Sequence, residues 1–334
     1  MSAPGTGRNI VSVENLAITY RTVYGTLKAL NGVNLSVVEG ESVSLVGESG
    51  CGKSTLGLAT VRLLPLNASY SSGRLILDGK NVATMSNRET VAMRGSTAFM
   101  IFQDPLNTLN PVKRIGVQML EAVRSRDRHR GSSFNEGDAH KEVVDKLGDV
   151  RMPDPDTIIM RYPHQLSGGQ IQRVVIAMGL LMRPKLMIAD EPTSALDVTV
   201  QAQVLKLMRE LQREYNMSII FITHDINVAY NISDRMVVMY AGEVVEEGEA
   251  GTVTKNALHP YSQALIASVP RTSKDQGRLT SISGSAANML NPPSGCRFHT
   301  RCPYAMDVCS SRSPPEIEKN GGLVRCFLHG GNAS

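Results

Sequence analysis

Short apolar stretches, several of them alternating with polar residues, predict strands at intervals along the chain. The alternation in IVSVENLAITY (residues 10–20) predicts an opening strand, and VNLSVVEGESVSLVG (33–47) predicts two strands around a Glu-Gly turn. STAFMIFQD (96–104), KLMIADEP (185–192) and SIIFITHD (218–225) predict short buried strands. DRMVVMYAGEVVEEG (234–248) predicts a hairpin with Gly242 in its turn.

Helical spacing of apolar residues follows several of these strands. It is present in TLGLATVRLL (55–64), through much of the region from about 105 to 183, and in TVQAQVLKLMRELQREY (199–215). Strands that alternate with helices predict an α/β fold with a mostly parallel sheet covered on both faces. Residues 271–295 are rich in Ser, Gly, Asn and Pro, which predicts a linker before the carboxyl-terminal residues 296–334.

Composition narrows the class of protein without identifying it. The 334 residues are 42% hydrophobic and 20% charged, enough for a full core and a small second domain. The net charge of +4 is slight and scattered, so nucleic acid is not an expected partner. The first ten residues lack an apolar segment, and the longest apolar run, VVIAMGLLM (174–182), is too short to span a bilayer. We therefore expect reduced thiols and membrane association only through protein partners.

A phosphate-binding loop is the strongest chemical signal. GESGCGKS (47–54) matches G-x-x-x-x-G-K-[ST] and lies between a predicted strand and a predicted helix. Glycines let backbone N–H groups approach phosphate oxygens, Lys53 supplies a positive charge, and the Ser54 hydroxyl can ligate Mg²⁺. The predicted nucleotide-binding residues are Gly47, Glu48, Ser49, Gly50, Cys51, Gly52, Lys53, Ser54 and Thr55. The helix start could lower the pKa of Cys51, but an inert thiol is the favoured interpretation.

Two carboxylates close the predicted strand LMIADE (186–191). Asp190 at the strand tip can hold Mg²⁺ directly or through water. Glu191 can polarise the water that attacks the γ-phosphate, or alternatively cap the following segment. Beside a phosphate loop, the catalytic interpretation of Glu191 is favoured.

Two further motifs carry a family resemblance. LSGGQ (166–170) opens a long apolar helix. IADEPTSALD (188–197) begins within the predicted strand at 185–192 and continues beyond it. With the phosphate loop, they make residues 10–270 resemble the ATPase subunits of ABC transporters. That resemblance implies an antiparallel amino-terminal β part, an inserted helical subdomain at about 105–183, and ATP with Mg²⁺ as ligands.

The same resemblance assigns roles to individual residues. Gln103 is similar to the glutamine that touches Mg²⁺ and the attacking water, and His224 to the switch histidine at the γ-phosphate. LSGGQ is similar to the family's signature motif, and its signature residues here are Ser167, Gly168, Gly169 and Gln170. These residues would reach the nucleotide of a second ATPase subunit, and Asp197 would link the two sites. Tyr20 is favoured over Tyr24 as the aromatic residue on adenine, since it ends the first strand.

Four of the five cysteines lie near the carboxyl terminus with the spacing C-x₅-C-x₆-C-x₁₆-C: Cys296, Cys302, Cys309 and Cys326. So dense a cluster predicts a four-thiolate metal site, but its spacing does not choose between zinc and iron–sulfur. HPYSQALIASVP (259–270) and GCRFHTRCPYAMDVC (295–309) resemble the extension of the peptide-permease ATPases, the dipeptide, oligopeptide and nickel importer subfamily. That resemblance implies a [4Fe–4S] cluster on these cysteines, with Zn²⁺ as the alternative.

The expected function is the ATPase subunit of a binding-protein-dependent importer of peptides or related solutes. Its expected partners are a second, homologous ATPase subunit, with a heterodimer favoured, two transmembrane permease subunits and an extracytoplasmic solute-binding protein. The chain would then lie at the cytoplasmic face of the membrane. Alternatives are import of nickel complexes or oligosaccharides, a soluble ABC ATPase of repair or translation, and a redox-regulatory module.

Overall fold

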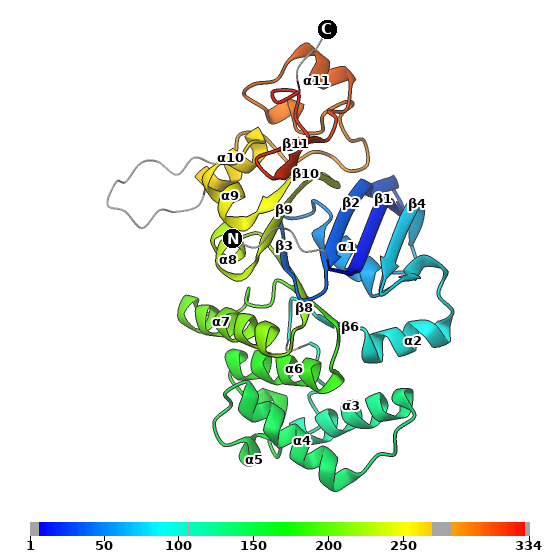
Figure 1. Cartoon of the computed structure of the whole chain (residues 1–334), viewed down its shortest axis with the longest axis vertical. Helices are drawn as coiled ribbons and strands as arrows, with labels where there is room; N and C mark the ends of the chain where they lie inside the picture. The colour runs from blue at the N-terminus through cyan, green and yellow to red at the C-terminus, as the bar shows by residue number, and fades with distance from the viewer. Residues whose placement is uncertain (1–6, 106, 269–281, 331–334) are drawn as a thin grey trace. The chain divides into compact units, whose positions relative to one another are not determined.

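The computed structural model describes residues 7–105, 107–268 and 282–330 (Figure 1). These residues divide into two compact units. Unit 1 contains residues 7–10, 38–41 and 84–220, and unit 2 contains residues 11–37, 42–83 and 221–330 apart from the stretch 269–281. Residues 271–281 of the predicted linker at 271–295 lie outside the described residues.

Unit 1 is mainly helical. Its elements are α2 (Asn87–Ser96), β6 (Ala98–Ile101), α3 (Ile115–Arg130), α4 (Glu136–Asp149), α5 (Pro155–Ile158), η2 (Pro163–Gln165), α6 (Gly168–Met182), β7 (Leu186–Asp190), α7 (Val198–Glu214) and the start of β8 (Ser218–Thr223). β6 and β7 pair in parallel, and α6 packs against β6, α3, α4 and α7. Helices α3 to α6 occupy the region predicted to be helical.

A buried ion pair fixes α3 to α4 in unit 1. Arg126 is 5% exposed and donates to both carboxylate oxygens of Glu142, at 2.7 and 2.9 Å. It also donates to the carbonyl of Leu181 near the end of α6 at 2.8 Å. A buried charge is tolerated only when it is paired and hydrogen-bonded, and both conditions are met here.

Unit 2 contains two sheets. Its elements are β1 (Asn9–Thr22), β2 (Gly25–Val38), β3 (Ser42–Val46), α1 (Lys53–Thr60), β4 (Ala68–Leu77), β5 (Lys80–Asn81), η1 (Val82–Thr84), α8 (Ile226–Ile232), β9 (Arg235–Tyr240), β10 (Glu243–Glu249), α9 (Ala250–Lys255), α10 (Pro260–Ala267), η3 (His299–Arg301), α11 (Asp307–Ser311), β11 (Ile317–Lys319) and β12 (Gly322–Val324). The amino-terminal sheet has the order β2-β1-β4-β5, with antiparallel pairs β1–β4 and β4–β5.

The other sheet of unit 2 combines parallel and antiparallel pairs. β3 and β9 are parallel, whereas β9–β10, β10–β12 and β11–β12 are antiparallel. The β9–β10 hairpin was predicted, and its two turn residues, Ala241 and Gly242, both have positive φ as a type I′ turn requires. β11 and β12 were not predicted, because three-residue strands are too short to show an alternating pattern.

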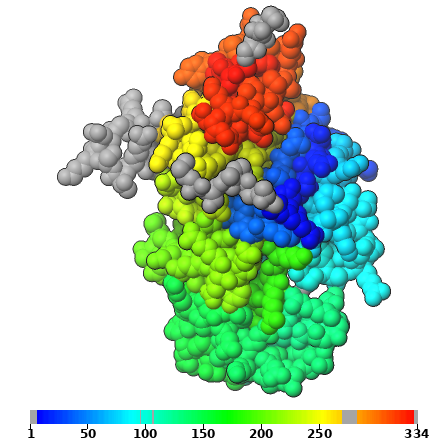
Figure 2. Space-filling view, in the orientation of Figure 1, coloured from blue at the N-terminus to red at the C-terminus, as the bar shows by residue number. Residues whose placement is uncertain are grey.

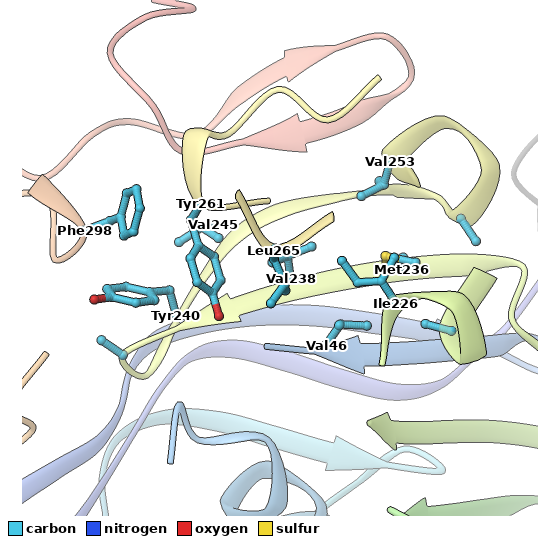
Figure 3. Close-up of a cluster of buried hydrophobic side chains, with 13 residues drawn as sticks. Val46, Ile226, Met236, Val238, Tyr240, Val245, Val253, Tyr261, Leu265 and Phe298 are labelled. Carbon is cyan, nitrogen blue, oxygen red and sulfur yellow. The ribbon is translucent and has the colours of Figure 1, made fainter. Parts of the chain in front are cut away.

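The carboxyl-terminal residues share the core of unit 2. Phe298, just before η3, is 1% exposed and its ring packs against Tyr240 of β9 and Tyr261 of α10, with centroids 5.2 and 5.4 Å apart (Figure 3). The same cluster contains Val46 of β3 and Val238 of β9. In Figure 2 the orange and red carboxyl-terminal residues lie against the yellow residues of α9 and α10. This segment is therefore packed into the unit that carries residues 47–55.

Candidate nucleotide and cysteine sites

The backbone of the phosphate loop requires glycine at two positions. β3 is fully buried and ends at Val46, and α1 begins at Lys53. Gly52 has φ of 109°, and a Cβ there would lie 2.7 Å from the carbonyl oxygen of Ala29. A Cβ on Gly47 would lie 2.2 Å from the carbonyl oxygen of Met239. Neighbouring backbone thus leaves no room for a side chain at either glycine, as the sequence motif implied.

Lys53 is folded back into this loop. Its side chain is buried, and Nζ donates to the carbonyl oxygens of Gly47 at 2.7 Å and Glu48 at 2.9 Å. A buried ammonium needs acceptors, and here the loop's own carbonyls provide them. Phosphate oxygens are stronger partners for an ammonium because they carry charge. The arrangement is suited to exchanging these carbonyls for a phosphate ligand.

Cys51 does not have the lowered pKa that its place near a helix start could give. The side chain is 4% exposed, and burial raises the pKa of the thiol more than the charge of Lys53 lowers it. The thiol also accepts a weak contact from Lys53 Nζ at 3.7 Å. Burial therefore favours the neutral form of the Cys51 thiol, which agrees with the interpretation of this residue as inert.

Tyr20 lies beside the start of α1, whereas Tyr24 is largely exposed to solvent. The hydroxyl groups of Tyr20 and Thr55 are 3.2 Å apart and share a hydrogen bond. Tyr24 follows the end of β1 and is 86% exposed. The ring of Tyr20 thus has a fixed place next to residue 55 of the proposed nucleotide-binding segment.

The carboxylates at the end of β7 lie in unit 1. Asp190 is 8% exposed and ends the strand. Glu191 has φ of 43°, a conformation that costs a non-glycine residue about 1–2 kcal/mol. Its Oε2 accepts a hydrogen bond from Nε2 of Gln103 at 3.0 Å. Gln103 and Glu191 were predicted to act on the same water, and the structure brings these two side chains together.

The signature residues begin α6. Ser167 is its N-cap, and Ser167 Oγ accepts from the Gln170 amide at 3.4 Å while Gln170 Oε1 accepts from the Ser167 amide at 3.0 Å. A Cβ on Gly169 would lie 2.6 Å from Cγ1 of Val200 in α7, so close packing also requires this glycine. Asp197 caps α7 by accepting from the amides of Thr199 and Val200, at 3.1 and 3.0 Å.

His224 follows β8 and is exposed. The capping role belongs to its neighbour, Asp225, which accepts the amide of Asn227 at 2.8 Å and begins α8. His224 is therefore neither the cap of α8 nor a buried, packed residue. An exposed imidazole at a strand end is accessible to a ligand.

The four carboxyl-terminal cysteines line one largely apolar cavity, together with His259, Phe298 and other residues. Burial raises the pKa of Cys302 and Cys326, and it raises that of Cys296 to about 11. Within the described residues, no group of three or more His, Cys, Asp or Glu side chains has an arrangement that could hold a metal ion. The four cysteines therefore lie around one cavity, as their clustering in the sequence predicted. The arrangement of their side chains does not support the predicted metal.

Two contacts of the loop were absent from the sequence-based predictions. The amide of Glu48 donates to the hydroxyl of Tyr261 at 2.8 Å, and the carboxylate of Glu48 is paired with Arg301 at 2.7 Å. Neither partner belongs to a nucleotide motif. Sequence spacing gives no sign of a contact between positions 253 residues apart.

Comparison with known proteins defines the class of protein. Residues 30–194 match the ABC transporter family, and residues 245–309 match the oligopeptide/dipeptide transporter C-terminal region. The ATP-binding cassette MJ0796, solved as a dimer in a post-hydrolysis state with ADP and Pi, superposes with a TM-score of 0.64 at 29% identity. That match covers 72% of this chain and 98% of MJ0796. The fold and loop are those of an ABC-type P-loop ATPase.

Full-length relatives define the family within that class. The dipeptide transport ATP-binding protein DppD of Bacillus subtilis (strain 168) is 42% identical over 321 residues, covering 96% of this chain and 94% of DppD. The oligopeptide transport ATP-binding protein OppD of Salmonella typhimurium is 42% identical over 325 residues, covering 97% and 95%. The chain belongs to the family of dipeptide and oligopeptide transport ATP-binding proteins. None of the helices in the described part of the chain is long and apolar enough to cross a membrane.

Proposed function

We propose that this chain is the ATP-hydrolysing subunit that powers a binding-protein-dependent importer of peptides. The observation that carries the substrate class is the 42% identity to DppD over nearly the whole of both chains. The matched carboxyl-terminal region supports it, because its description names oligopeptide and dipeptide transporters. The phosphate loop, with Lys53 buried against its own carbonyls, supports ATP as the ligand.

At the nucleotide, we assign the following roles. Lys53 and the amides of residues 47–55 bind the phosphates, and the ring of Tyr20 stacks on adenine. Ser54, Gln103 and Asp190 would hold Mg²⁺, which would neutralise charge on the phosphates. Glu191 orients and polarises the attacking water, Gln103 positions the Glu191 carboxylate, and His224 contacts the γ-phosphate.

The tyrosine assignment has a direct test. Tyr20→Ala should weaken ATP binding about five- to thirtyfold, because stacking of a base on an aromatic ring is worth about 1–2 kcal/mol. The matched control is Tyr24→Ala, which should bind ATP like the wild type. Inorganic triphosphate should bind both variants equally, since it lacks the base. Weaker ATP binding by Tyr24→Ala alone would reverse the assignment.

A complete site is proposed to need a second ATPase subunit. Ser167, Gly168, Gly169 and Gln170 at the start of α6 act on the nucleotide held by that subunit, where the helix N-terminus favours phosphate. Asp197, as the cap of α7, fixes the segment that connects the two sites. Two homologous chains would close around two ATP molecules, and we favour a heterodimer. Closure would act on two permease subunits, which receive solute from an extracytoplasmic binding protein. The ATPase chain would lie at the cytoplasmic face of the membrane.

We further propose a [4Fe–4S] cluster on Cys296, Cys302, Cys309 and Cys326, with Zn²⁺ as the alternative. The supporting observation is that the four thiols line one apolar cavity, because deprotonated cysteine sulfur is a ligand that both iron–sulfur clusters and zinc accept. The four side chains would have to lose their protons and move into a closer arrangement to bind either group. The cluster would organise a segment with little core of its own. Its role is structural in this proposal.

Peptide import can be tested in the source organism with Lys53→Ala in place of the wild-type gene. Uptake of labelled dipeptide or tetrapeptide should be lost, because loss of the loop ammonium removes a phosphate contact that ATP binding needs. Free amino acid uptake is the control and should be unchanged. Loss of nickel or oligosaccharide uptake with normal peptide uptake would overturn the substrate class. Normal uptake of all of these solutes would favour a soluble ABC ATPase instead.

A further inference from the structure

The carboxyl-terminal segment is joined to the phosphate loop by one ion pair. Arg301 NH1 lies 2.7 Å from Oε2 of Glu48, and NH2 lies 3.1 Å from Oε1, so the pair is bidentate. The side chain of Arg301 is 4% exposed and that of Glu48 is 26% exposed. Glu48 is the second residue of GESGCGKS, and Arg301 ends η3 in the carboxyl-terminal segment. A segment outside the nucleotide motifs therefore contacts the loop itself.

Arg301 is held rigidly enough to position its partner. Nε donates to the carbonyl oxygen of Ser283 at 2.8 Å, and NH2 donates to that of Ile282 at 3.3 Å. NH1 also donates to the hydroxyl of Tyr240 at 3.4 Å. Each of the three guanidinium nitrogens therefore has a hydrogen-bond partner other than Glu48. The orientation of the fork is fixed by backbone and by a buried tyrosine.

Every polar group of Glu48 is engaged. Its amide donates to the hydroxyl of Tyr261, which is fully buried, and its carbonyl oxygen accepts from Lys53. Its carboxylate is bound by Arg301. Residues of α10 and η3 therefore constrain the loop residue that in turn contacts the proposed phosphate-binding lysine.

The negative charge of the Glu48 carboxylate opposes phosphate binding unless it is neutralised. A carboxylate within a loop that binds a triphosphate would repel that ligand, and the repulsion is strong where water is partly excluded. The buried guanidinium cancels this charge at the place where it arises. A guanidinium stays charged at any ordinary pH, so this neutralisation does not depend on pH.

We propose that Arg301 is a positioning residue of the nucleotide site, which neutralises Glu48 and fixes the phosphate loop from the carboxyl-terminal segment. The inference rests on the proposed assignment of residues 47–54 to ATP binding. It makes the carboxyl-terminal segment part of the ATPase site, in addition to any metal it holds. It also explains why a glutamate is tolerated in this loop.

The experiment measures the affinity of the purified full-length chain for a fluorescent ATP analogue with Mg²⁺. Arg301→Ala should weaken binding about tenfold, because it leaves the Glu48 carboxylate unpaired in the loop. Glu48→Gln alone should change the affinity by less than about threefold, since it removes the repelling charge. The double variant Arg301→Ala with Glu48→Gln should recover to within about threefold of the wild type. Arg312→Ala, which replaces an exposed arginine in the same segment, is the matched control and should bind normally.

Two further readouts separate electrostatics from a loss of folding. The deficit of Arg301→Ala relative to wild type should shrink as salt rises from about 0.05 M to about 0.5 M, since salt screens the unpaired charge. Thermal unfolding of each variant reports folding independently. If the double variant binds as weakly as Arg301→Ala, or if Arg301→Ala binds within about twofold of wild type, the inference is wrong. Failure of the wild-type chain to bind the analogue would instead overturn the proposed ATP site.

Discussion

Replacing Glu191 by Gln should reduce steady-state ATP hydrolysis by about two to three orders of magnitude, because general-base assistance typically contributes that much. Glu191 follows β7 directly, and its carboxylate accepts a hydrogen bond from Gln103 at 3.0 Å. The amide introduced by Glu191→Gln has the same shape as the carboxylate but cannot accept a proton from water. Nucleotide binding should stay within about threefold of wild type, since this residue has no assigned contact with the phosphates before reaction.

The measurement combines phosphate release with the affinity for ATP. Glu214→Gln is the matched control, because Glu214 ends α7 and is exposed. It should hydrolyse ATP at the wild-type rate. Because the chain is proposed to act with a second ATPase subunit, both variants are compared in the same assembled complex. Wild-type hydrolysis by Glu191→Gln would show that Glu191 only caps the segment that follows β7.

The backbone at Glu191 supports a catalytic rather than a capping role. A positive φ at a glutamate costs about 1–2 kcal/mol, and strain of this kind is concentrated at functional sites. The conformation turns the chain directly after the buried strand, while Asp190 is 8% exposed at the strand tip. Two adjacent carboxylates thereby have different environments. Such a difference allows one to hold a metal ion and the other to meet water.

A contiguous motif made the backbone of the phosphate loop predictable. The glycines of the phosphate loop are needed because of local backbone approach, and that requirement is written within eight residues. The strand before it, Ser42–Val46, is buried throughout, and the helix after it starts at Lys53, close to the start near Ser54 that the pattern predicted. The Gln103–Glu191 contact was predictable only through the family resemblance, because 88 residues separate the two side chains.

The contacts of Glu48 could not be predicted for the same physical reason. Glu48 occupies a position that the motif leaves variable, and Arg301 follows a segment of polar, irregular composition. Their contact depends on Phe298, Tyr240 and Tyr261, whose rings pack together in the core of unit 2 (Figure 3). Tertiary packing of this kind has no periodic signal in a single sequence.

Loss of one cysteine ligand should remove the whole proposed cluster. The wild-type chain purified without oxygen should contain about four irons and four acid-labile sulfides, and Cys302→Ala should contain almost none of either. All four thiols line one cavity, so the loss of one leaves an open position that the apolar walls cannot replace. The variant should also unfold at a lower temperature, since metal binding contributes to folding.

Cys51→Ala is the matched control for this measurement. Cys51 lies in the phosphate loop, contacts Lys53 and is not among the residues that line the cysteine cavity. Its replacement should leave iron and sulfide at the wild-type content. One zinc and no sulfide in the wild-type chain would replace the cluster by a four-thiolate zinc site. Absence of both metals from anaerobically purified protein would mean that these cysteines are free thiols packed in an apolar cavity, and the cofactor proposal would then be wrong.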